Sequence, residues 1–149
     1  MGYHQSADQK VKKIDCLDSL QFQGLHLSKR HFTEILPDAT LTLDINDNGK
    51  IILCSVTTVI TLPAIGSGGL GPYTLVNYGV ETDKVSDVQI TIAPNSADRI
   101  SGCDISATED KDIVNTLATA RRGDYIKLAW GATAGWTITE MVGTWAREA

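Results

Sequence analysis

The positions of the histidines limit the acid–base chemistry that this chain can perform. All three, His4, His26 and His31, lie in the first 31 residues, and residues 32–149 contain none. A serine or cysteine nucleophile needs a base within hydrogen-bond reach. Histidine-assisted catalysis would therefore require the N-terminal segment to fold over the rest of the chain. No G-x-S-x-G nucleophile motif is present. We predict that the chain is not an enzyme.

The segment Gly66–Gly71 matches the G-x-G-x-x-G pattern of dinucleotide-binding loops. In such a site the glycines lead into a helix whose N-terminus faces the pyrophosphate. Here Pro72 follows, and then Tyr73-Thr74-Leu75-Val76, which is typical of a strand. The sequence therefore predicts a loop between two strands and no nucleotide cofactor.

The segment that begins at Asp44 matches the first half of an EF-hand calcium loop. Oxygen-bearing side chains stand at positions 1, 3 and 5, and Gly49 stands at position 6. Position 12, where a bidentate glutamate is needed, is Ser55. We expect a hairpin-type turn held by Asx side-chain bonds. A looser calcium site in the same turn is the alternative, and no metal or other cofactor is assigned.

The three cysteines, Cys16, Cys54 and Cys103, are far apart in the sequence. Their odd number predicts a chain that folds in a reducing compartment. Cys54 ends an apolar run, where a thiol usually packs as a small hydrophobic group. No pair or cluster of cysteine and histidine has the spacing of a zinc site.

From residue 39 the apolar residues alternate with polar ones, which is the period of a half-buried strand. Turn residues separate eight such segments at short intervals, and sixteen threonines suit the solvent-facing positions of strands. This pattern predicts an all-β domain over residues 38–149, an antiparallel β-sandwich, jelly roll or barrel. The predicted strands are 39–45, 50–54, 57–62, 73–78, 87–93, 112–117, 124–130 and 135–140.

Residues 1–37 are predicted to form an extended arm in front of this domain. Ser6 and Gln9 have the spacing of a capping box, so a short helix is predicted over about 7–17. Isolated helices of this length are marginal in water. The apolar residues that follow have no regular period, which indicates a segment that becomes ordered by docking. It would dock either on its own body or on a neighbouring molecule.

Charge is divided unevenly between the two parts. Residues 1–31 hold five basic and three acidic residues, a net of +2, whereas residues 32–149 hold eight basic and fifteen acidic residues, a net of −7. An acidic body repels phosphate backbones, so we predict no nucleic-acid partner. No apolar run approaches the length of a membrane helix, and the first 15 residues lack the apolar core of a secretory signal. We therefore expect no membrane partner.

The tryptophans are concentrated in the last 20 residues. Trp136 is predicted to lie in the core, and Trp130 is expected to share the inward face of its strand with Ile126 and Leu128. Trp145, near the end of the chain, is the predicted interface residue, because aromatic side chains commonly anchor interfaces. A platform for carbohydrate is the weaker alternative.

Four segments of the body, taken in order, resemble the small capsid decoration, or cement, proteins of tailed bacteriophages. The segment Arg30-His31-Phe32-Thr33-Glu34 before them is similar to the arm of that family. The resemblance covers roughly residues 29–145. The four segments are Ala39-Thr40-Leu41-Thr42 with Asn48-Gly49-Lys50-Ile51-Ile52-Leu53, Val59-Ile60-Thr61-Leu62-Pro63-Ala64, Tyr73-Thr74-Leu75-Val76-Asn77, and Gly123-Asp124-Tyr125-Ile126-Lys127-Leu128 with Gly135-Trp136.

This resemblance implies a non-catalytic virion protein that assembles as a homotrimer on the outer surface of the expanded capsid. Its partner would be the major capsid protein, and its arm would lie across neighbouring subunits of the shell. Lys29 and Arg30 are then expected to steer the arm to an acidic shell. Packing of the arm's apolar side chains under the protein's own sheet is the alternative. The predicted apolar anchors of the arm are Phe22, Leu25, Leu27 and Phe32.

Two other functions remain open at the level of the sequence. One is a phage tail-fibre or receptor-binding module that contacts a cell-surface glycan, since the same short motifs are found in such modules. The other is a small β enzyme or ligand-binding barrel, which would need a deep pocket with paired ionisable groups.

Overall fold

A computed structural model describes residues 19–22, 25–28, 34–35, 37–66, 71–131 and 135–149 of the chain. It divides into two compact units, Met1–His31 and Phe32–Ala149. The first unit contains an antiparallel hairpin of β1 (Ser19–Phe22) and β2 (Leu25–Ser28). The helix predicted over 7–17 lies outside the described residues. The division falls between residues 31 and 32, and residues 34–35 of the predicted arm already belong to the second unit.

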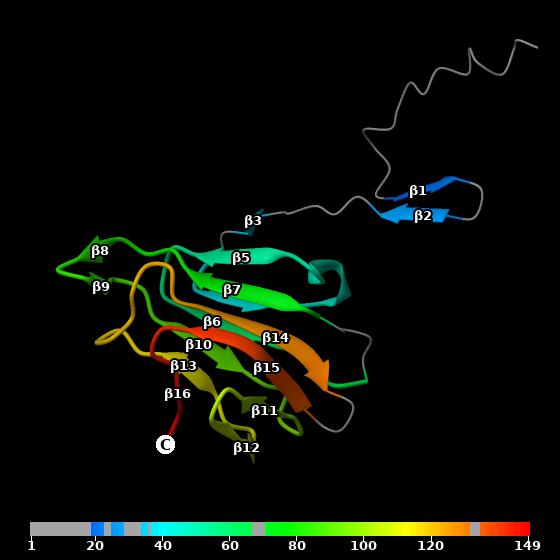
Figure 1. The fold of residues 1–149 in the computed structure, drawn as a ribbon. Coiled ribbons are helices and arrows are strands. Elements are labelled where there is room, and N and C mark those ends of the chain that lie inside the picture. Colours follow the sequence, from blue (N-terminus) through cyan, green and yellow to red (C-terminus); the bar gives the residue numbers. More distant parts are fainter. Residues whose placement is uncertain (1–18, 23–24, 29–33, 36, 67–70, 132–134) are drawn as a thin grey trace, which may run out of the picture. The chain divides into compact units, whose positions relative to one another are not determined.

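The second unit consists of two stacked sheets (Figure 1). Buried residues of both sheets form one continuous hydrophobic core, so the unit is a β-sandwich and the all-β prediction is confirmed. A separate two-stranded hairpin consists of β8 (Glu81–Thr82) and β9 (Val85–Ser86). The seven-stranded sheet has the order β12 (Ile105–Glu109), β11 (Arg99–Gly102), β15 (Gly135–Val142), β14 (Tyr125–Gly131), β7 (Tyr73–Asn77), β5 (Ile51–Cys54) and β3 (Glu34–Ile35). The five-stranded sheet has the order β16 (Ala146–Arg147), β13 (Ile113–Asn115), β10 (Ile90–Ala93), β6 (Thr58–Thr61) and β4 (Thr40–Thr42).

The core follows from the period of two in the strands. In β7, Tyr73, Leu75 and Asn77 are buried, while the alternate residues Thr74 and Val76 are only partly covered. The same alternation sends apolar side chains inward from both sheets. The largest fully buried side chain is that of Trp136, whose ring centroid lies 5.4 Å from that of Tyr73, as expected for a core tryptophan.

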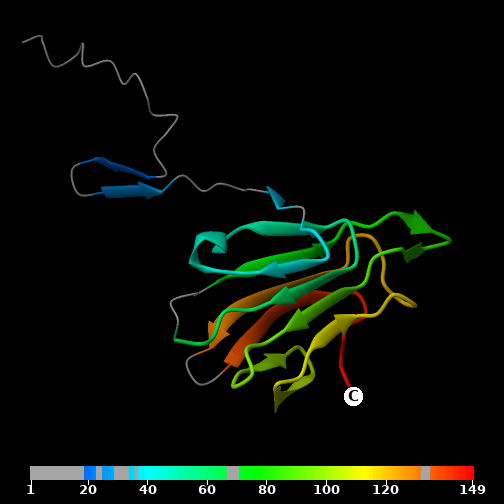
Figure 2. The same ribbon diagram turned by 180° about the vertical axis from the view of Figure 1, so that it is seen from behind.

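The prediction of purely antiparallel pairing was wrong, because both sheets are mixed. From β3 to β7 the chain crosses to the other sheet after every strand. Successive strands of one sheet therefore run in the same direction, which makes β3, β5 and β7 parallel neighbours. In the five-stranded sheet β4, β6 and β10 are parallel neighbours for the same reason. Figure 2 shows this sheet in front. Antiparallel pairing dominates later in the chain, where β14 and β15 form a long hairpin.

Each of the eight predicted strands overlaps an observed one. The strands that the sequence analysis missed are the two-residue strands β3, β8, β9 and β16, the hairpin of the first unit, and the pair β11 and β12. In β12 only part of the side-chain surface is buried and no position is fully buried, so its sequence lacks a clear alternation.

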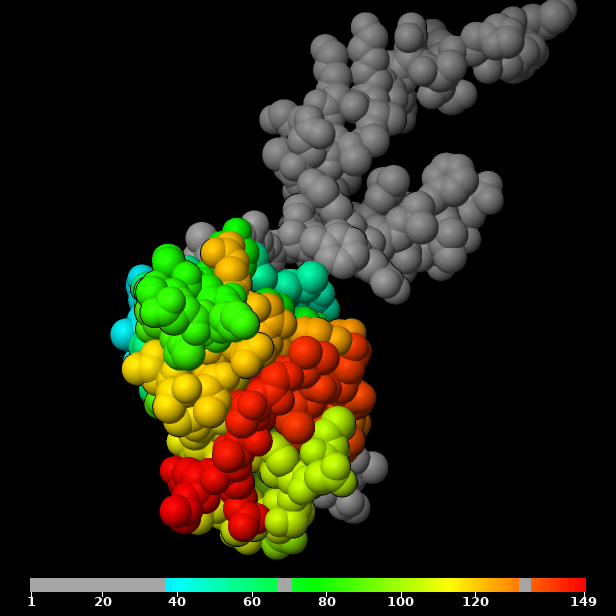
Figure 3. All heavy atoms as spheres, turned by 60° about the vertical axis from the view of Figure 1, so that its left-hand side comes forward, coloured from blue at the N-terminus to red at the C-terminus, as the bar shows by residue number. Residues whose placement is uncertain are grey.

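One lateral edge of the sandwich is closed by a single arginine. Arg147 of β16 donates from a guanidinium nitrogen to the backbone oxygen of Ser106, at 3.2 Å, and to its hydroxyl, at 2.9 Å. The same nitrogen donates to the hydroxyl of Thr108. Because β16 and β12 belong to different sheets, these bonds join the two layers, and Figure 3 shows the C-terminal segment beside the region around residue 105.

A buried polar network joins the two sheets at one end of the sandwich. Asn115 of β13 donates to the carboxylate of Asp124 at 2.9 Å, and its side-chain oxygen accepts a bond from Asn77 of β7 at 2.9 Å. Asn77 in turn accepts a bond from the hydroxyl of Ser86 at 2.7 Å. All four residues are at most 5% exposed. Polar groups this deeply buried stabilise a fold only when their partners are present.

We predict that Asn115→Ala lowers the free energy of unfolding by about 2–4 kcal/mol, since it leaves both Asn77 and Asp124 with unmade bonds in a buried site. Urea denaturation followed by tryptophan fluorescence measures this loss. Thr116→Ala, at the exposed neighbouring position, is the control and should change stability by less than about 0.5 kcal/mol. Equal effects of the two substitutions would show that the network does not hold the sheets together.

Candidate interaction surfaces

The buried cysteine and the metal-ligating residue types bear on the chemistry that the described residues can perform. The thiol of Cys54 is buried, and burial raises its pKa to about 12, so it is an inert thiol at neutral pH. No group of three or more histidine, cysteine, aspartate or glutamate side chains in this part of the chain is placed to hold a metal ion. No helix among the described residues is long and apolar enough to cross a membrane.

The calcium-like motif of the sequence has a structural role, whereas the glycine motif is only partly described. Gly71 and Pro72 lead directly into the strand β7, as predicted, and residues 67–70 lie outside the described part. The calcium-like segment forms a short 3₁₀ helix, Ile45–Asp47, whose N-cap Asp44 accepts a bond from the backbone N–H of Asn46 at 2.7 Å. Asp47 is paired with Lys50 at 2.9 Å. The carboxylates of this turn are thus engaged in local bonds.

The predicted contact residues of the arm are only partly described. Phe22 and Leu25 are opposite each other in the hairpin of β1 and β2, and Leu27 is opposite Leu20. The strand pairing therefore brings Phe22, Leu25 and Leu27 into one small hairpin. Lys29, Arg30 and Phe32 lie outside the described residues.

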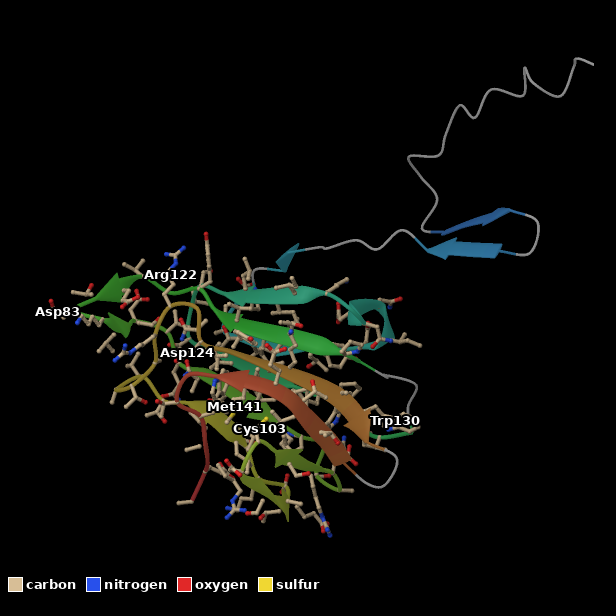
Figure 4. The ribbon with its side chains drawn as sticks, viewed as in Figure 1. Asp83, Cys103, Arg122, Asp124, Trp130 and Met141 are labelled. Atoms are coloured by element: carbon tan, nitrogen blue, oxygen red, sulfur yellow. The ribbon has the colours of Figure 1, made fainter. Side chains whose placement is uncertain are left out.

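The structure places Trp130 and Trp145 differently from the prediction, since Trp145 is buried and Trp130 is exposed. Trp145, the predicted interface residue, is only 7% exposed, packs in the core and donates from its indole nitrogen to the backbone oxygen of Val142 at 2.9 Å. It has little surface left for a partner. Trp130, expected to face the core, is 43% exposed and lies near the end of β14 (Figure 4).

Four apolar side chains form a row across the outer face of the seven-stranded sheet. The strand register places Leu53 next to Val76, Val76 next to Tyr125, and Tyr125 next to Val142. We call these four residues the apolar row. Val142 is 45% exposed and the other three are partly exposed. A continuous apolar strip on an outer sheet face is typical of a surface that contacts another molecule.

An arginine and a tyrosine lie beside this row, just past the end of β7. Tyr78 follows β7 and is 41% exposed, and the guanidinium carbon of Arg122 lies 4.1 Å from the centroid of its ring. Figure 4 shows Arg122 at the outer surface of this end of the sandwich. In the part of the chain that the structure describes, no carboxylate forms an ion pair with Arg122. Tyrosine and arginine are the residue types enriched at interfaces, so this pair extends the apolar row with a positive charge.

Backbone hydrogen bonds hold the segments that carry Tyr78 and Arg122. The N–H of Tyr78 donates to the oxygen of Cys54 at 2.8 Å, and the N–H of Gly123 donates to the oxygen of Asn77 at 2.8 Å. The second bond joins the loop that carries Arg122 to the residue before Tyr78. Tyr78 and Arg122 are therefore held by Asn77, the last residue of β7, which also belongs to the buried network.

A three-member polar cluster lies beside the apolar row. Glu140 accepts hydrogen bonds from the hydroxyl of Tyr125 and from the ammonium group of Lys127. The hydrogen bond to Lys127, followed by that to Tyr125, lowers the pKa of Glu140 below its usual value. The same bonds raise the pKa values of Lys127 and Tyr125. At neutral pH the cluster is thus a neutral phenol with an intact ion pair.

The β8–β9 hairpin projects from the same end of the sandwich. Asp83, at its tip in Figure 4, and Lys84 both have positive φ angles, 53° and 70°, as a tight two-residue hairpin turn requires. The base of the hairpin is tied to the neighbouring loop, since the N–H of Ser86 donates to the oxygen of Ala120 at 2.7 Å. Val80, beside it, is 64% exposed.

The outer face of the five-stranded sheet has a different composition. The strand register aligns two rows of residues across this sheet, and none of the eight side chains carries a charge. We call this surface the threonine face. Its members are Thr40, Val59, Thr91, Val114 and Ala146 in one row, and Thr42, Thr61 and Ala93 in the other.

Comparison of this chain with protein-family models, with curated protein sequences and with solved structures gives no match.

Sequence reasoning did not identify these surfaces. The period of two in a sequence indicates which positions of one strand face outward, but the alignment of Val76 with Tyr125 depends on the order of strands in the sheet. Strands β7 and β14 are almost fifty residues apart in the chain and pair directly. Arg122 lies in a loop, where only the fold decides which ring it covers.

We predict that Glu140→Gln lowers the pKa of Tyr125, because the phenol then loses the carboxylate that favours its neutral form. Phenolate absorbance during an alkaline pH titration measures this change. In the parent protein the bond stabilises the folded state at neutral pH and is lost as the pH rises through the raised pKa of Tyr125. The ion pair between Lys127 and Glu140 is lost as the pH falls through the lowered pKa of Glu140.

Tyr125→Phe identifies the absorbance step of this residue and serves as the control. Burial raises the pKa of Tyr73 to about 12, and the difference between the parent and Tyr125→Phe curves separates its absorbance change from that of Tyr125. Identical titration curves for the parent protein and Glu140→Gln would contradict the bonding described above.

Proposed function

We propose that this protein is a non-catalytic decoration protein that binds the outer face of an expanded phage capsid. In this proposal it assembles as a homotrimer and stabilises the joints between subunits of the major capsid protein. The observation that supports it best is the apolar row with Tyr78 and Arg122 beside it. Exposed aliphatic, tyrosine and arginine side chains are the types enriched at protein contacts.

The charge distribution supports a partner surface that is mainly apolar and carries an acidic group at one place. Residues 32–149 carry a net charge of −7, so a strongly acidic partner is repelled by most of this unit. Arg122 stands next to Arg121 and provides a local positive charge beside the apolar row. A partner that places a carboxylate at Arg122 and apolar side chains on the row satisfies both features.

The N-terminal unit supplies the second contact in this proposal. Its basic charge of +2 differs in sign from that of the body, and its hairpin contains the apolar residues Phe22, Leu25 and Leu27. The arm would add contact area on neighbouring shell subunits. Three copies attached at once would bind more tightly than one, since the later contacts form at high effective concentration.

A receptor-binding module of a tail fibre is the second candidate, and the exposure of Trp130 favours it. An indole ring that is 43% exposed offers a flat apolar surface against which a sugar ring can stack. Binding of the purified protein to cells or glycans, reduced by Trp130→Ala, would favour this function over capsid decoration.

The decoration proposal predicts that the full-length protein binds expanded shells and does not bind their unexpanded precursors. Co-sedimentation of the protein with purified shells measures binding, and a thermal melt of the shells measures stabilisation. We expect removal of residues 1–31 to weaken binding at least about tenfold, because the arm contacts are lost together with their contribution to effective concentration. Unchanged binding after this deletion would remove the arm from the proposal.

For the sandwich itself, we expect Arg122→Glu to weaken shell binding about tenfold or more, since it places a like charge against an acidic partner. Arg99→Glu is the matched control. It makes the same change of charge at the other end of the seven-stranded sheet, where Arg99 pairs with Glu109 at 3.4 Å. Equal losses for the two variants would show that overall charge, rather than this surface, governs binding. Retained binding with both would show that Arg122 makes no contact.

A further inference from the structure

We infer that the β1–β2 hairpin binds the shell through one of its two faces, which we call the hairpin face. This inference rests on the proposed function, in which the arm contacts the shell, and it names the residues of that contact. The surface that covers the hairpin face is an apolar patch of the major capsid protein that is bordered by carboxylates. The members of the hairpin face are Leu20, Phe22, Leu25 and Leu27.

The strand register divides the residues of the hairpin into an apolar and a polar set. Leu20 pairs with Leu27, and Phe22 pairs with Leu25 (Figure 1). Directly paired residues share a face of an antiparallel ladder, and residues two apart in one strand share that face as well. These four residues therefore lie on the same face. The members of the opposite face, all of them polar, are Ser19, Gln21, His26 and Ser28.

This division explains why the apolar residues of the arm have no regular period in the sequence. Within each strand they alternate, at positions 20 and 22 and again at 25 and 27, but the step from 22 to 25 is three residues. The change of spacing between the strands conceals the alternation. Only the pairing of β1 with β2 shows that the four positions belong to one face.

A hairpin of this size needs a surface that covers its apolar face. Each strand has four residues, and an isolated two-stranded hairpin is at best marginally stable in water. Packing of the apolar face against another surface supplies the missing stability. The opposite face is polar at all four positions, so it is suited to remain in water. The hairpin therefore suits a position on the surface of a partner, with one side covered.

The charges of the arm indicate what kind of surface covers the hairpin face. Lys29 and Arg30 directly follow β2, and residues 1–31 carry a net charge of +2. Positive charges beside an apolar contact favour a partner that places carboxylates around an apolar patch. A second copy of the hairpin carries the same positive charge, so charge disfavours contact between two hairpins.

The hairpin face is small and therefore acts as one contact among several. Its paired residues are about 5 Å apart across the strands, and the two pairs are about 7 Å apart along them. A patch of these dimensions is far below the roughly 800 Å² per partner of a standard interface. Tight binding then requires that several arms attach to one shell at once, since each later contact forms at high effective concentration.

Two face-exchange variants test the inference without changing the composition or charge of the arm. One combines His26→Leu with Leu27→His, and the other combines Gln21→Phe with Phe22→Gln. We expect each to weaken binding of the full-length protein to expanded shells at least about tenfold, because a polar group replaces a large apolar one in the contact. Co-sedimentation measures this binding. His26→Gln and Gln21→Thr leave the hairpin face intact and should bind like the parent protein.

A cross-link on the polar face tests the hairpin separately from shell binding. Gln21→Cys with His26→Cys, in a background with Cys16→Ser and Cys103→Ser, should form a disulfide on mild oxidation, because directly paired Cα atoms lie within disulfide distance. Gln21→Cys with Ser28→Cys, which are not paired, is the control and should cross-link more slowly. The cross-linked protein should still bind shells. Failure of the paired cysteines to cross-link, or loss of binding once they do, would overturn the inference.

The outcomes separate the inference from the proposed function. Face-exchange variants that bind shells as well as the parent protein would overturn the inference and leave the decoration function standing. The acidic second unit of the protein is the other surface that could cover the hairpin face. A fluorescence melt reports on that unit, since all three tryptophans lie between residues 130 and 145. A lower melting temperature of the free face-exchange variants would therefore overturn the inference. A parent protein that binds no shells would refute the proposed function and this inference together.

Discussion

The arrangement of the sandwich depends on a small set of buried polar contacts at one of its ends. Asn77, Asn115 and Asp124 come from three separate segments and bond to one another away from water. The hydrophobic core holds the two sheets together but does not fix their alignment, because apolar contacts are non-directional. Hydrogen bonds in a buried site are directional and costly to leave unmade, so they specify a single alignment. The same network requires glycine at position 143, since an added Cβ atom would lie 2.1 Å from the carboxylate carbon of Asp124.

This constraint also determines which side chains reach the surface together. The carboxylate of Asp124 accepts a bond from the N–H of Arg121 at 3.0 Å, and so it fixes the loop that carries Arg122. Asn77 precedes Tyr78 and bonds to Ser86 at the base of the β8–β9 hairpin. The exposed arginine, tyrosine and hairpin are thus attached to one rigid point. Contact residues held in this way lose little conformational entropy on binding.

The crossing of the chain between the sheets has a second consequence. Because β3 to β7 alternate between layers, each lateral edge of the sandwich contains one strand from each sheet. At one edge, β12 and β16 are joined by Arg147. At the other edge, β3 and β4 are short, with two and three residues. Short edge strands limit uncontrolled pairing with other chains.

The sequence predicted much of the fold because its evidence is local. Alternation of apolar and polar residues identified β5, β6, β7 and β10, and glycine, proline and asparagine marked the turns between them. The same local evidence did not predict which strands pair or in which direction they run. Whether β6 and β10 run parallel depends on where the chain goes after it leaves each strand, and no local pattern records that. The short strands failed for a different reason, since two residues do not establish a period.

The interaction surfaces were harder to predict than the core for a physical reason. Burial is encoded residue by residue, so Trp136 could be assigned to the core from its position in one strand. A surface row is encoded by register between strands that are distant in sequence, such as β5, β7 and β14. Trp145 illustrates the limit, because a bonded and buried indole near the chain end has the same local sequence as an exposed one.

The two outer faces of the sandwich suit different kinds of contact. The face with Lys127, Glu140 and Arg122 carries charges whose arrangement selects a partner by sign and steers its approach. The threonine face presents only threonine, valine and alanine at its eight aligned positions, so shape contributes more there than charge does. The first face therefore suits a partner of opposite local charge.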